Sequence, residues 1–395
     1  MEEVLDKKIE IDKSNWLPVK FGDVVFEPKE STKDPIGDNI EHIVGLEHIT
    51  SEDIHLCNSN SIEESTTFTK KFEVDDVLFG RRRAYLKKAA QAKFSGICSG
   101  DITVFRSKDN LLPELLPFIV NNDKFFDYAI KHSAGGLSPR VKFKDLANYE
   151  FLLPPKDQQT KLAELLWAMD EVVEKENEVL ENLNISKKAF EKKYLIKYRN
   201  GIEKKLSTDY KVYRLSEIAE ITGGSTPSRN VQEYWNGDIP WLTPTDVTKH
   251  NKISLSRTRE YITESGLRDI SNRLYPIGSI LYCSRATIGY AIINDVPMAT
   301  NQGFSNFICN EKVNNYFLYF LLKHLTNELT RLAGGSTFLE ISKSSIRRFK
   351  VVIPSQNIMM KITEKLLDYE KNRVELESKT SSSKALQKSL INQVF

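Results

Sequence analysis

Apolar side chains recur at a seven-residue helical spacing in two stretches of the chain, one at its middle and one at its end. In the middle stretch, from about residue 155 to 198, the pattern breaks only at Glu176 and Lys187, and no Gly or Pro interrupts it before Gly201. This pattern predicts a helix with a coiled-coil seam, on the order of 60 Å long at about 1.5 Å per residue. The predicted seam consists of Leu162, Leu166, Met169, Val173, Leu180, Leu183, Phe190 and Tyr194.

The end of the chain repeats the pattern less regularly from residue 358 onward. Polar side chains occupy seam positions at Arg373, Thr380 and Ser383. A helix of this kind cannot bury its own apolar stripe. We therefore expect the two helices to pair with each other, antiparallel, as an intramolecular coiled coil. The apolar positions of this second seam are Ile362, Leu366, Tyr369, Leu376, Leu386 and Leu390.

The segments that precede the two helices predict similar mixed α/β domains. In the first half, short β-rich runs at 40–46, 77–79 and 101–105 precede a predicted helix at 111–131, a Gly-Gly turn and a strand that Pro154 ends. The second half repeats this order, with a helix at 316–332 and a strand that Pro354 ends, 200 positions after Pro154. The prediction is an α+β fold with a first domain at 1–153, a central helix at 154–200, a second domain at 201–354 and a C-terminal helix at 355–395.

Composition narrows the class of protein without identifying it. The 395 residues carry a formal net charge of only +2, so the total charge argues neither for nor against nucleic acid. The four cysteines form no zinc-type cluster, which fits a reduced cytosol. The N-terminus lacks the apolar core of a signal peptide, and no apolar run is long enough to span a membrane. We expect a cytoplasmic protein that does not enter a membrane.

Four motifs in the second half carry a resemblance to a known family. They are Gly223-Gly-Ser-Thr-Pro-Ser, Tyr234-Trp-Asn-Gly-Asp-Ile-Pro-Trp, Ala333-Gly-Gly-Ser-Thr, and the strand ended by Pro354 that leads into a helix. In this order they resemble the specificity (S) subunit of a type I restriction-modification system, over nearly the whole chain. The first half departs from the family pattern, because Glu27-Pro-Lys-Glu-Ser-Thr stands where the Gly-Gly turn would be.

The resemblance implies a role and a set of partners. The two globular domains would be target recognition domains that bind double-stranded DNA. The long helices would space them and dock two methyltransferase (M) subunits, and restriction (R) subunits would join for cleavage. S-adenosylmethionine, ATP and magnesium would act in those partners, with no cofactor in this chain.

Antiparallel helices have a geometric consequence for the target. Each helix starts where its own domain stops, so we expect the two domains to lie at opposite ends of the helix pair and to contact two half-sites. Because the domains differ in sequence, the predicted target is asymmetric: two unlike short words with an unread gap.

Phosphate contacts need Lys, Arg and hydroxyl groups, and base contacts need polar side chains that reach groove edges. The run Arg81–Arg83, directly after a predicted strand, is the densest basic cluster in the first domain. A solvated surface is the alternative interpretation for any single basic residue. The candidate DNA-contacting residues are Arg81, Arg82, Arg83, Arg140, Ser225, Thr226, Arg229, Arg285, Lys343 and Arg347.

Two other residue types near these candidates have a structural interpretation. Trp235 and Trp241 could stack on bases, but we favour core aromatics beside a turn. The Gly-Gly pairs at 135–136, 223–224 and 334–335 are expected to allow positive φ or close packing.

Catalytic motifs are missing from the sequence. No phosphate-binding loop or dinucleotide fingerprint occurs, and Leu153-Pro154-Pro155-Lys156 lacks the amide and the aromatic ring of an amino-methyltransferase motif. We therefore predict a DNA-recognition subunit that does no chemistry itself. A stand-alone DNA-binding regulator or structural protein with a coiled coil is the alternative, and an enzyme with an unrecognised motif is a third.

Overall fold

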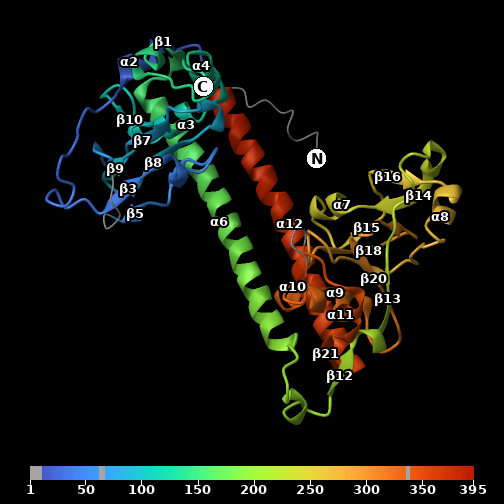
Figure 1. Ribbon diagram of the computed structural model, residues 1–395. Helices are drawn as coiled ribbons and strands as arrows, with labels where there is room; N and C mark the ends of the chain where they lie inside the picture. The colour runs from blue at the N-terminus through green and yellow to red at the C-terminus, as the bar shows by residue number, and fades with distance from the viewer. Residues whose placement is uncertain (1–10, 62–66, 335–338) are drawn as a thin grey trace. The chain divides into compact units, whose positions relative to one another are not determined.

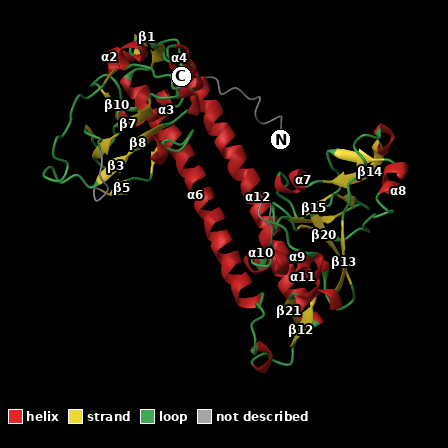
Figure 2. Cartoon of the chain, viewed as in Figure 1, coloured by secondary structure: helices red, strands yellow, loops and turns green. Residues whose placement is uncertain are grey.

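A computed structural model describes residues 11–61, 67–334 and 339–395 of the protein (Figure 1). Short strands and helices alternate along the chain, together with two long helices (Figure 2), so the α+β class expected from the sequence is confirmed. No helix in these described ranges is both long and apolar enough to cross a bilayer.

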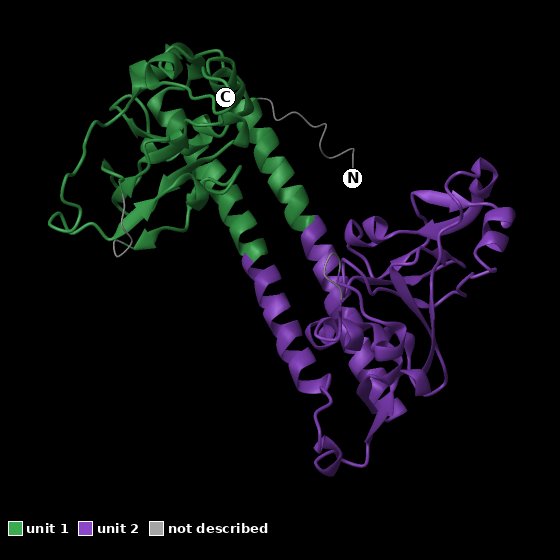
Figure 3. Ribbon diagram, viewed as in Figure 1, with its two compact units in different colours: residues 1–177, 379–395 green, residues 178–378 purple. Residues whose placement is uncertain are grey.

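The chain forms two compact units (Figure 3). The first unit contains residues 1–177 and 379–395, and the second contains residues 178–378. Their boundaries fall within the two long helices, whereas the sequence placed boundaries at the helix ends. The last residues of the chain therefore belong to the first unit.

The first unit is built mostly from short strands. Its central strand, β7, is buried at all four positions. The elements are β1 (Leu17–Lys20), α2 (Phe21–Val24), β2 (Val25–Phe26), β3 (His42–Val44), β4 (His55–Leu56), β5 (Asn60–Ser61), β6 (Lys70–Phe72), β7 (Val77–Gly80), β8 (Ala89–Ala92), β9 (Gly96–Cys98), β10 (Ile102–Ser107), α3 (Leu116–Val120), α4 (Asp123–Lys131), α5 (Phe143–Leu146), β11 (Glu150–Leu153) and the first part of α6 (Lys156–Tyr194).

The second unit follows the same order with longer insertions. Its elements are β12 (Tyr210–Arg214), β13 (Ala219–Gly223), β14 (Trp235–Leu242), α7 (Pro244–Thr248), β15 (Ser254–Leu255), β16 (Glu260–Ile262), α8 (Glu264–Asp269), β17 (Ile280–Cys283), β18 (Ala291–Asn294), β19 (Ala299–Thr300), β20 (Phe304–Cys309), α9 (Asn315–His324), α10 (Thr326–Thr330), α11 (Lys343–Arg348), β21 (Lys350–Pro354) and the first part of α12 (Gln356–Val394).

Sheet topology confirms the internal repeat. The five-stranded sheet of the first unit has the order β2-β10-β7-β8-β4, and that of the second has the order β13-β20-β17-β18-β15. In each sheet only the last pair is parallel, β4 with β8 and β15 with β18. The units differ in their smaller sheets, β5-β3-β9-β6 and β16-β14-β19.

The prediction of a single helix at 111–131 is wrong, because the structure has two helices there, α3 and α4, with Asn122 between them. Asn122 has an extended backbone, and its side-chain oxygen accepts a hydrogen bond from the Lys124 amide at 2.8 Å, which caps α4. Its side-chain nitrogen donates to the Ile391 carbonyl at 3.0 Å. The break thus serves a tertiary contact. The helix predicted at 316–332 is likewise divided into α9 and α10.

Within the first unit, α6 and α12 pack in opposite directions. Asp170 of α6 accepts a hydrogen bond from Gln387 of α12 at 3.1 Å, and the later Glu176 meets the earlier Lys379 at 3.4 Å. Leu166 and Leu390 join the same buried core as strands of the globular domain. The end of the chain therefore completes the core of the first domain.

The second unit shows the same antiparallel packing. The Phe190 ring lies 5.8 Å from the Tyr369 ring, and Lys187 forms an ion pair with Glu370. The two polar breaks in the α6 pattern, Glu176 and Lys187, thus each meet a charged residue of α12. Charged pairs at seam positions favour one register over others, because a shifted register would bury them without a partner.

The seam residues predicted from the sequence are buried or half-buried, with one exception. Leu386 is 42 % exposed, because the less regular pattern of the C-terminal helix misassigned its face. Buried positions are Leu166, Val173, Ile362, Leu366 and Leu390, and half-buried positions are Leu162, Met169, Leu180, Leu183, Phe190, Tyr194, Tyr369 and Leu376.

We expect Leu390→Ala to destabilise the first unit by about 2–5 kcal/mol, because it leaves a cavity in a close-packed core. Leu386→Ala, one helical turn earlier at a side chain that is 42 % exposed, is the matched control and should change stability by less than about 0.5 kcal/mol. Hydrogen exchange of peptides from β7 to β10 measures the stability of the first unit separately from that of the second. Equal protection in the two variants would contradict packing of Leu390 in that core.

Candidate nucleic-acid interface

The basic run of the first domain begins where β7 leaves the sheet. Nη1 of Arg82 lies 3.1 Å from Oδ2 of Asp101, and Nε of Arg140 lies 2.7 Å from Oδ1 of the same carboxylate. Arg82 and Arg140 also form a backbone bridge. The structure therefore brings two candidates from distant parts of the sequence onto one acidic residue. Asp101 follows β9 and was missed by the sequence analysis.

Electrostatics keeps this carboxylate ionised. Partial burial acts to raise the pKa of Asp101, but hydrogen bonds from Arg140 and Arg82 outweigh it and hold the pKa below its usual range. Arg83 is exposed and has a left-handed backbone with φ of 55°. Arg81 and Arg82 are both half-buried, so Arg83 is the most accessible member of the run.

In the second domain, the loop after β13 is fastened to the β19–β20 connection. The Ser225 amide donates to the Thr300 carbonyl at 2.8 Å, and the Thr226 hydroxyl donates to the side chain of Gln302. Gln302 and Arg285 both line a hollow of about 240 Å³. Two candidates, Thr226 and Arg285, thus lie beside Gln302, and a third, Ser225, is held two residues earlier at Thr300. No motif or charge cluster in the sequence marks Gln302.

Arg229 is already engaged within its own domain. Its guanidinium forms a two-pronged ion pair with Glu260, at 2.5 and 3.0 Å, and lies 3.8 Å from the ring centre of Trp235. Trp241 is 2 % exposed, and its indole donates to the Ser225 carbonyl at 3.1 Å. The preferred interpretation of Trp241 as a core aromatic is confirmed. Trp235 is half-buried beneath Arg229.

The two basic candidates on α11 have different surroundings. The Arg347 guanidinium donates to the Ile221 carbonyl at 3.2 and 2.5 Å, so it fastens α11 to β13. The Lys343 amine lies directly over Gly223, where any Cβ would collide with it. That amine is the far end of a flexible side chain, so this contact alone does not require a glycine at 223. A Cβ at Gly224 would instead collide with the backbone carbonyls of Thr300 and Asn301, so close packing explains the second glycine of the pair. In the first domain Gly135 has φ of 117°, as expected for a turn glycine, and Gly335 lies outside the described residues.

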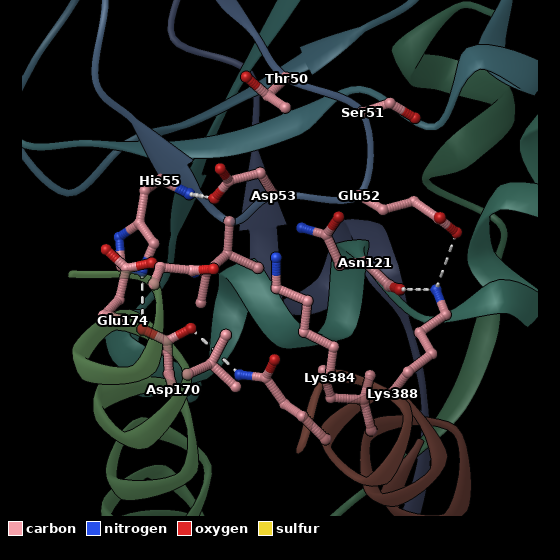
Figure 4. A pocket seen from close by; sticks show the side chains of 15 residues that line it. Thr50, Ser51, Glu52, Asp53, His55, Asn121, Asp170, Glu174, Lys384 and Lys388 are labelled. Atoms are coloured by element: carbon pink, nitrogen blue, oxygen red, sulfur yellow. Dashed lines mark hydrogen bonds and ion pairs between the residues drawn. The ribbon is translucent and has the colours of Figure 1, made fainter. Parts of the chain in front are cut away.

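A polar hollow of about 350 Å³ in the first unit lies between the loop at 50–55 and the two helices (Figure 4). Nε2 of His55 lies 2.7 Å from Oδ2 of Asp170, and both residues are 6 % exposed. Figure 4 shows these two side chains facing each other, with Lys384 and Lys388 reaching in from α12. This buried pair thus connects strand β4 with helix α6. Gln387 of α12 donates a hydrogen bond to the same Asp170 carboxylate, so α12 is connected as well.

This hollow lacks the arrangement of a hydrolase. A Ser-His-Asp or Cys-His-Asp triad requires a hydroxyl or thiol that is hydrogen-bonded to the second ring nitrogen of the histidine. Nδ1 of His55 has no hydrogen-bond partner in the described residues, and the Ser51 hydroxyl donates to the Leu86 carbonyl instead. The described residues also contain no His, Cys, Asp and Glu group suited to a metal ion. The pair is better explained as a structural contact.

Comparison with known families gives a match along most of the chain. A family model described as "Type I restriction modification DNA specificity domain" matches residues 13–184 and 207–383.

Curated relatives agree with that match. The MjaIX specificity subunit of Methanocaldococcus jannaschii is 42 % identical over 160 residues, 40 % of this chain and 37 % of that protein. The EcoR124I/EcoR124II specificity subunit of Escherichia coli is 27 % identical over 222 residues, 53 % of this chain and 52 % of that protein. These two alignments span from about a third to a half of the relatives' length.

Two solved structures share the fold. A chain from a study of complex assembly and conformational transition of the type I R-M system superposes with a TM-score of 0.62 at 19 % identity. The S subunit of a type I system from M. genitalium superposes with a TM-score of 0.61 at 14 % identity. Each covers 98 % of both chains.

The His55–Asp170 pair predicts how the stability of the first unit depends on pH. The hydrogen bond to Asp170 raises the pKa of His55 above its ordinary value, although burial opposes the shift. Of the nearby charged residues, Lys93 lowers the pKa of His55 and Glu174 raises it. A raised folded-state pKa stabilises the fold fully below the unfolded value of about 6.5 and loses that effect as pH rises through the folded value.

We therefore expect thermal stability of the first unit to fall as pH rises above about 6.5. His55→Gln should flatten this dependence, and so should Asp170→Asn. Differential scanning calorimetry across this pH range, with hydrogen exchange of peptides around β4, provides the measurement. If His55→Gln kept the full pH dependence, another group would be responsible.

Proposed function

Because the chain belongs to the type I restriction-modification DNA specificity domain family, we propose that it reads two different short words in double-stranded DNA. Each globular domain reads one word, and the chain itself carries out no chemistry. The target is asymmetric, because the two domains have different sequences on a shared fold. The helices α6 and α12 set the unread gap between the words, since each runs unbroken through both units.

The observation that carries this proposal is the repeat of one backbone plan with unlike polar surfaces. Both domains have the same five-stranded sheet order, and in both an arginine, Arg82 or Arg285, comes two residues after the end of the central strand. Around that position the first domain has further arginines, whereas the second has Thr226 and Gln302. Arg, Gln and Thr side chains are those that contact phosphates and base edges.

The partners proposed for this chain are two methyltransferase (M) subunits, which dock on the helices, and restriction (R) subunits. Support for docking is the apolar surface that α6 leaves exposed. Leu165 and Val172 in the first unit are 45 % and 50 % exposed, and Val179 and Ile185 in the second are 51 % and 56 % exposed. Exposed apolar side chains in a row are typical of protein interaction surfaces.

The chemistry is proposed to belong to those partners. S-adenosylmethionine would be used by the methyltransferase subunits to methylate a base flipped out of the duplex, and ATP and magnesium by the restriction subunits. This chain would hold the duplex in register. The complex is proposed to act in the cytoplasm.

The proposal is tested by co-expressing the chain with a methyltransferase subunit from its source and by sequencing the methylated DNA. We expect a stable complex and methylation at a split, asymmetric motif. A stand-alone regulator would instead bind its site alone and would not co-purify with a methyltransferase. Methyl transfer by the isolated chain would contradict a non-catalytic role.

Exchange of one domain provides a sharper prediction. Replacing residues 14–150 by the first recognition domain of another family member should change one half of the methylated motif and leave the other half and the gap unchanged. The reciprocal exchange of residues 208–350 is the matched control and should change the other half. A change in both halves would contradict independent reading.

A further inference from the structure

The two domains share a junction where the central strand leaves the sheet, and its backbone hydrogen bonds match one for one. The Arg81 amide donates to the Asp101 carbonyl at 3.0 Å, as the Ser284 amide does to the Gly303 carbonyl at 2.9 Å. Further along, the Val141 amide donates to the Arg81 carbonyl at 3.0 Å. In the second domain the Ile341 amide likewise donates to the Ser284 carbonyl at 2.9 Å.

The match extends to an unusual backbone conformation. Arg83 and Ala286 occupy equivalent positions and have φ of 55° and 59°. Their amides donate to the equivalent carbonyls of Pro139, at 2.9 Å, and Leu339, at 3.0 Å. Non-glycine residues rarely adopt this conformation, and it persists where the surrounding structure enforces it. Both domains therefore hold this junction in one defined shape.

The side chains at the junction differ in charge. The junction of the first domain contains four arginines, Arg81, Arg82, Arg83 and Arg140, and one carboxylate, Asp101. That carboxylate contacts Arg82 and Arg140. In the second domain Arg285 stands against Glu340, 3.7 Å away, and the equivalents of Arg81, Arg83 and Asp101 are uncharged. The acidic residue also comes from a different segment, because Glu340 is the equivalent of Arg140.

The Asp101 contact has the features of a positioning contact. Its two oxygens serve different arginines, and its side chain is only 21 % exposed, whereas those of Arg82 and Arg140 are 37 % and 44 % exposed. Nη2 of Arg82 is held further by the Ser138 hydroxyl at 3.1 Å. An arginine fixed by a carboxylate presents its remaining N–H groups in a defined direction. The carboxylate also cancels part of the charge that attracts DNA of any sequence.

We propose that Asp101 is a specificity-determining positioning residue. It holds Arg82 and Arg140 in the orientation that reads the first half-target, and it limits their attraction to phosphates elsewhere. This inference rests on the proposed DNA-reading function. The junction of the second domain, with one arginine and one carboxylate, depends less on charge. The two half-sites should then differ in the salt dependence of their binding.

The test uses the full chain in complex with its methyltransferase partner. One probe is a duplex that carries the motif identified by sequencing the methylated DNA. The other is a duplex of random sequence. Asp101→Asn should bind the random duplex more tightly and should lower the ratio of specific to random affinity. The plot of log affinity for the random duplex against log salt should steepen by about one. That corresponds to an extra three- to fourfold loss of affinity between about 50 and 200 mM salt.

Asp109→Asn is the matched control, because Asp109 is an exposed residue of the same domain and the charge change is identical. It should leave both the salt slope and the specificity ratio near the wild-type values. Asp101→Glu, which keeps the charge, should restore the wild-type slope. Adding Arg82→Gln and Arg140→Gln to Asp101→Asn should remove the gain in random binding.

Three outcomes would overturn the inference. The first is an unchanged slope in Asp101→Asn, and the second is the same slope change in Asp109→Asn. The third is a lowered melting temperature with parallel losses on both duplexes, which would indicate a structural role alone. If the wild-type complex does not prefer the methylated motif at all, the proposed function fails instead.

Discussion

The antiparallel packing of α6 against α12 is the constraint on which both units depend. In the first unit the end of α12 supplies Leu390 and Ile391 to the core of a domain whose strands all come from residues 17–153. In the second unit the beginning of α12 supplies Ile362 and Leu366 in the same way. Each domain core therefore includes part of a long helix, and neither helix is a simple spacer. Burial of such side chains contributes roughly 1.5–3 kcal/mol each, so the helix pair and the domains stabilise one another.

Charged residues give this packing its register. Glu176 and Lys187 interrupt the apolar pattern of α6, and each lies opposite a charged residue of α12, Lys379 and Glu370. Glu176 is buried while Lys379 is 67 % exposed, and both Lys187 and Glu370 are largely buried. Such ion pairs add little net stability, because desolvation offsets much of their attraction. They are costly to separate, however, so a helix shifted by one turn would bury unpaired charge. Register matters for a protein proposed to measure the distance between two half-targets.

The duplicated domain separates backbone shape from recognition chemistry. Hydrogen bonds fix the same junction in both units, down to the left-handed backbone at Arg83 and Ala286. The side chains around it are free to differ, and they do: arginines around Asp101 in one unit, and Thr226, Gln302 and the Arg285–Glu340 pair in the other. A fold that holds its loops by main-chain contacts can change its side chains without losing its shape. That property suits the proposed function, in which two similar domains read different sequences.

The sequence alone determined the repeat, the long helices, their pairing and the family, because heptad spacing and proline-terminated strands are local signals that do not depend on what packs against them. It could not determine where helices break, since Asn122 interrupts the predicted helix to cap α4 and to hold the distant Ile391 carbonyl. It also placed Leu386 on the buried face, because a less regular pattern fits more than one face. For the candidate interface it found Arg82 and Arg140 but not Asp101, which joins them. Only the tertiary structure decided that partnership, because residues far apart in the sequence become neighbours through sheet order, and no spacing along the chain records it.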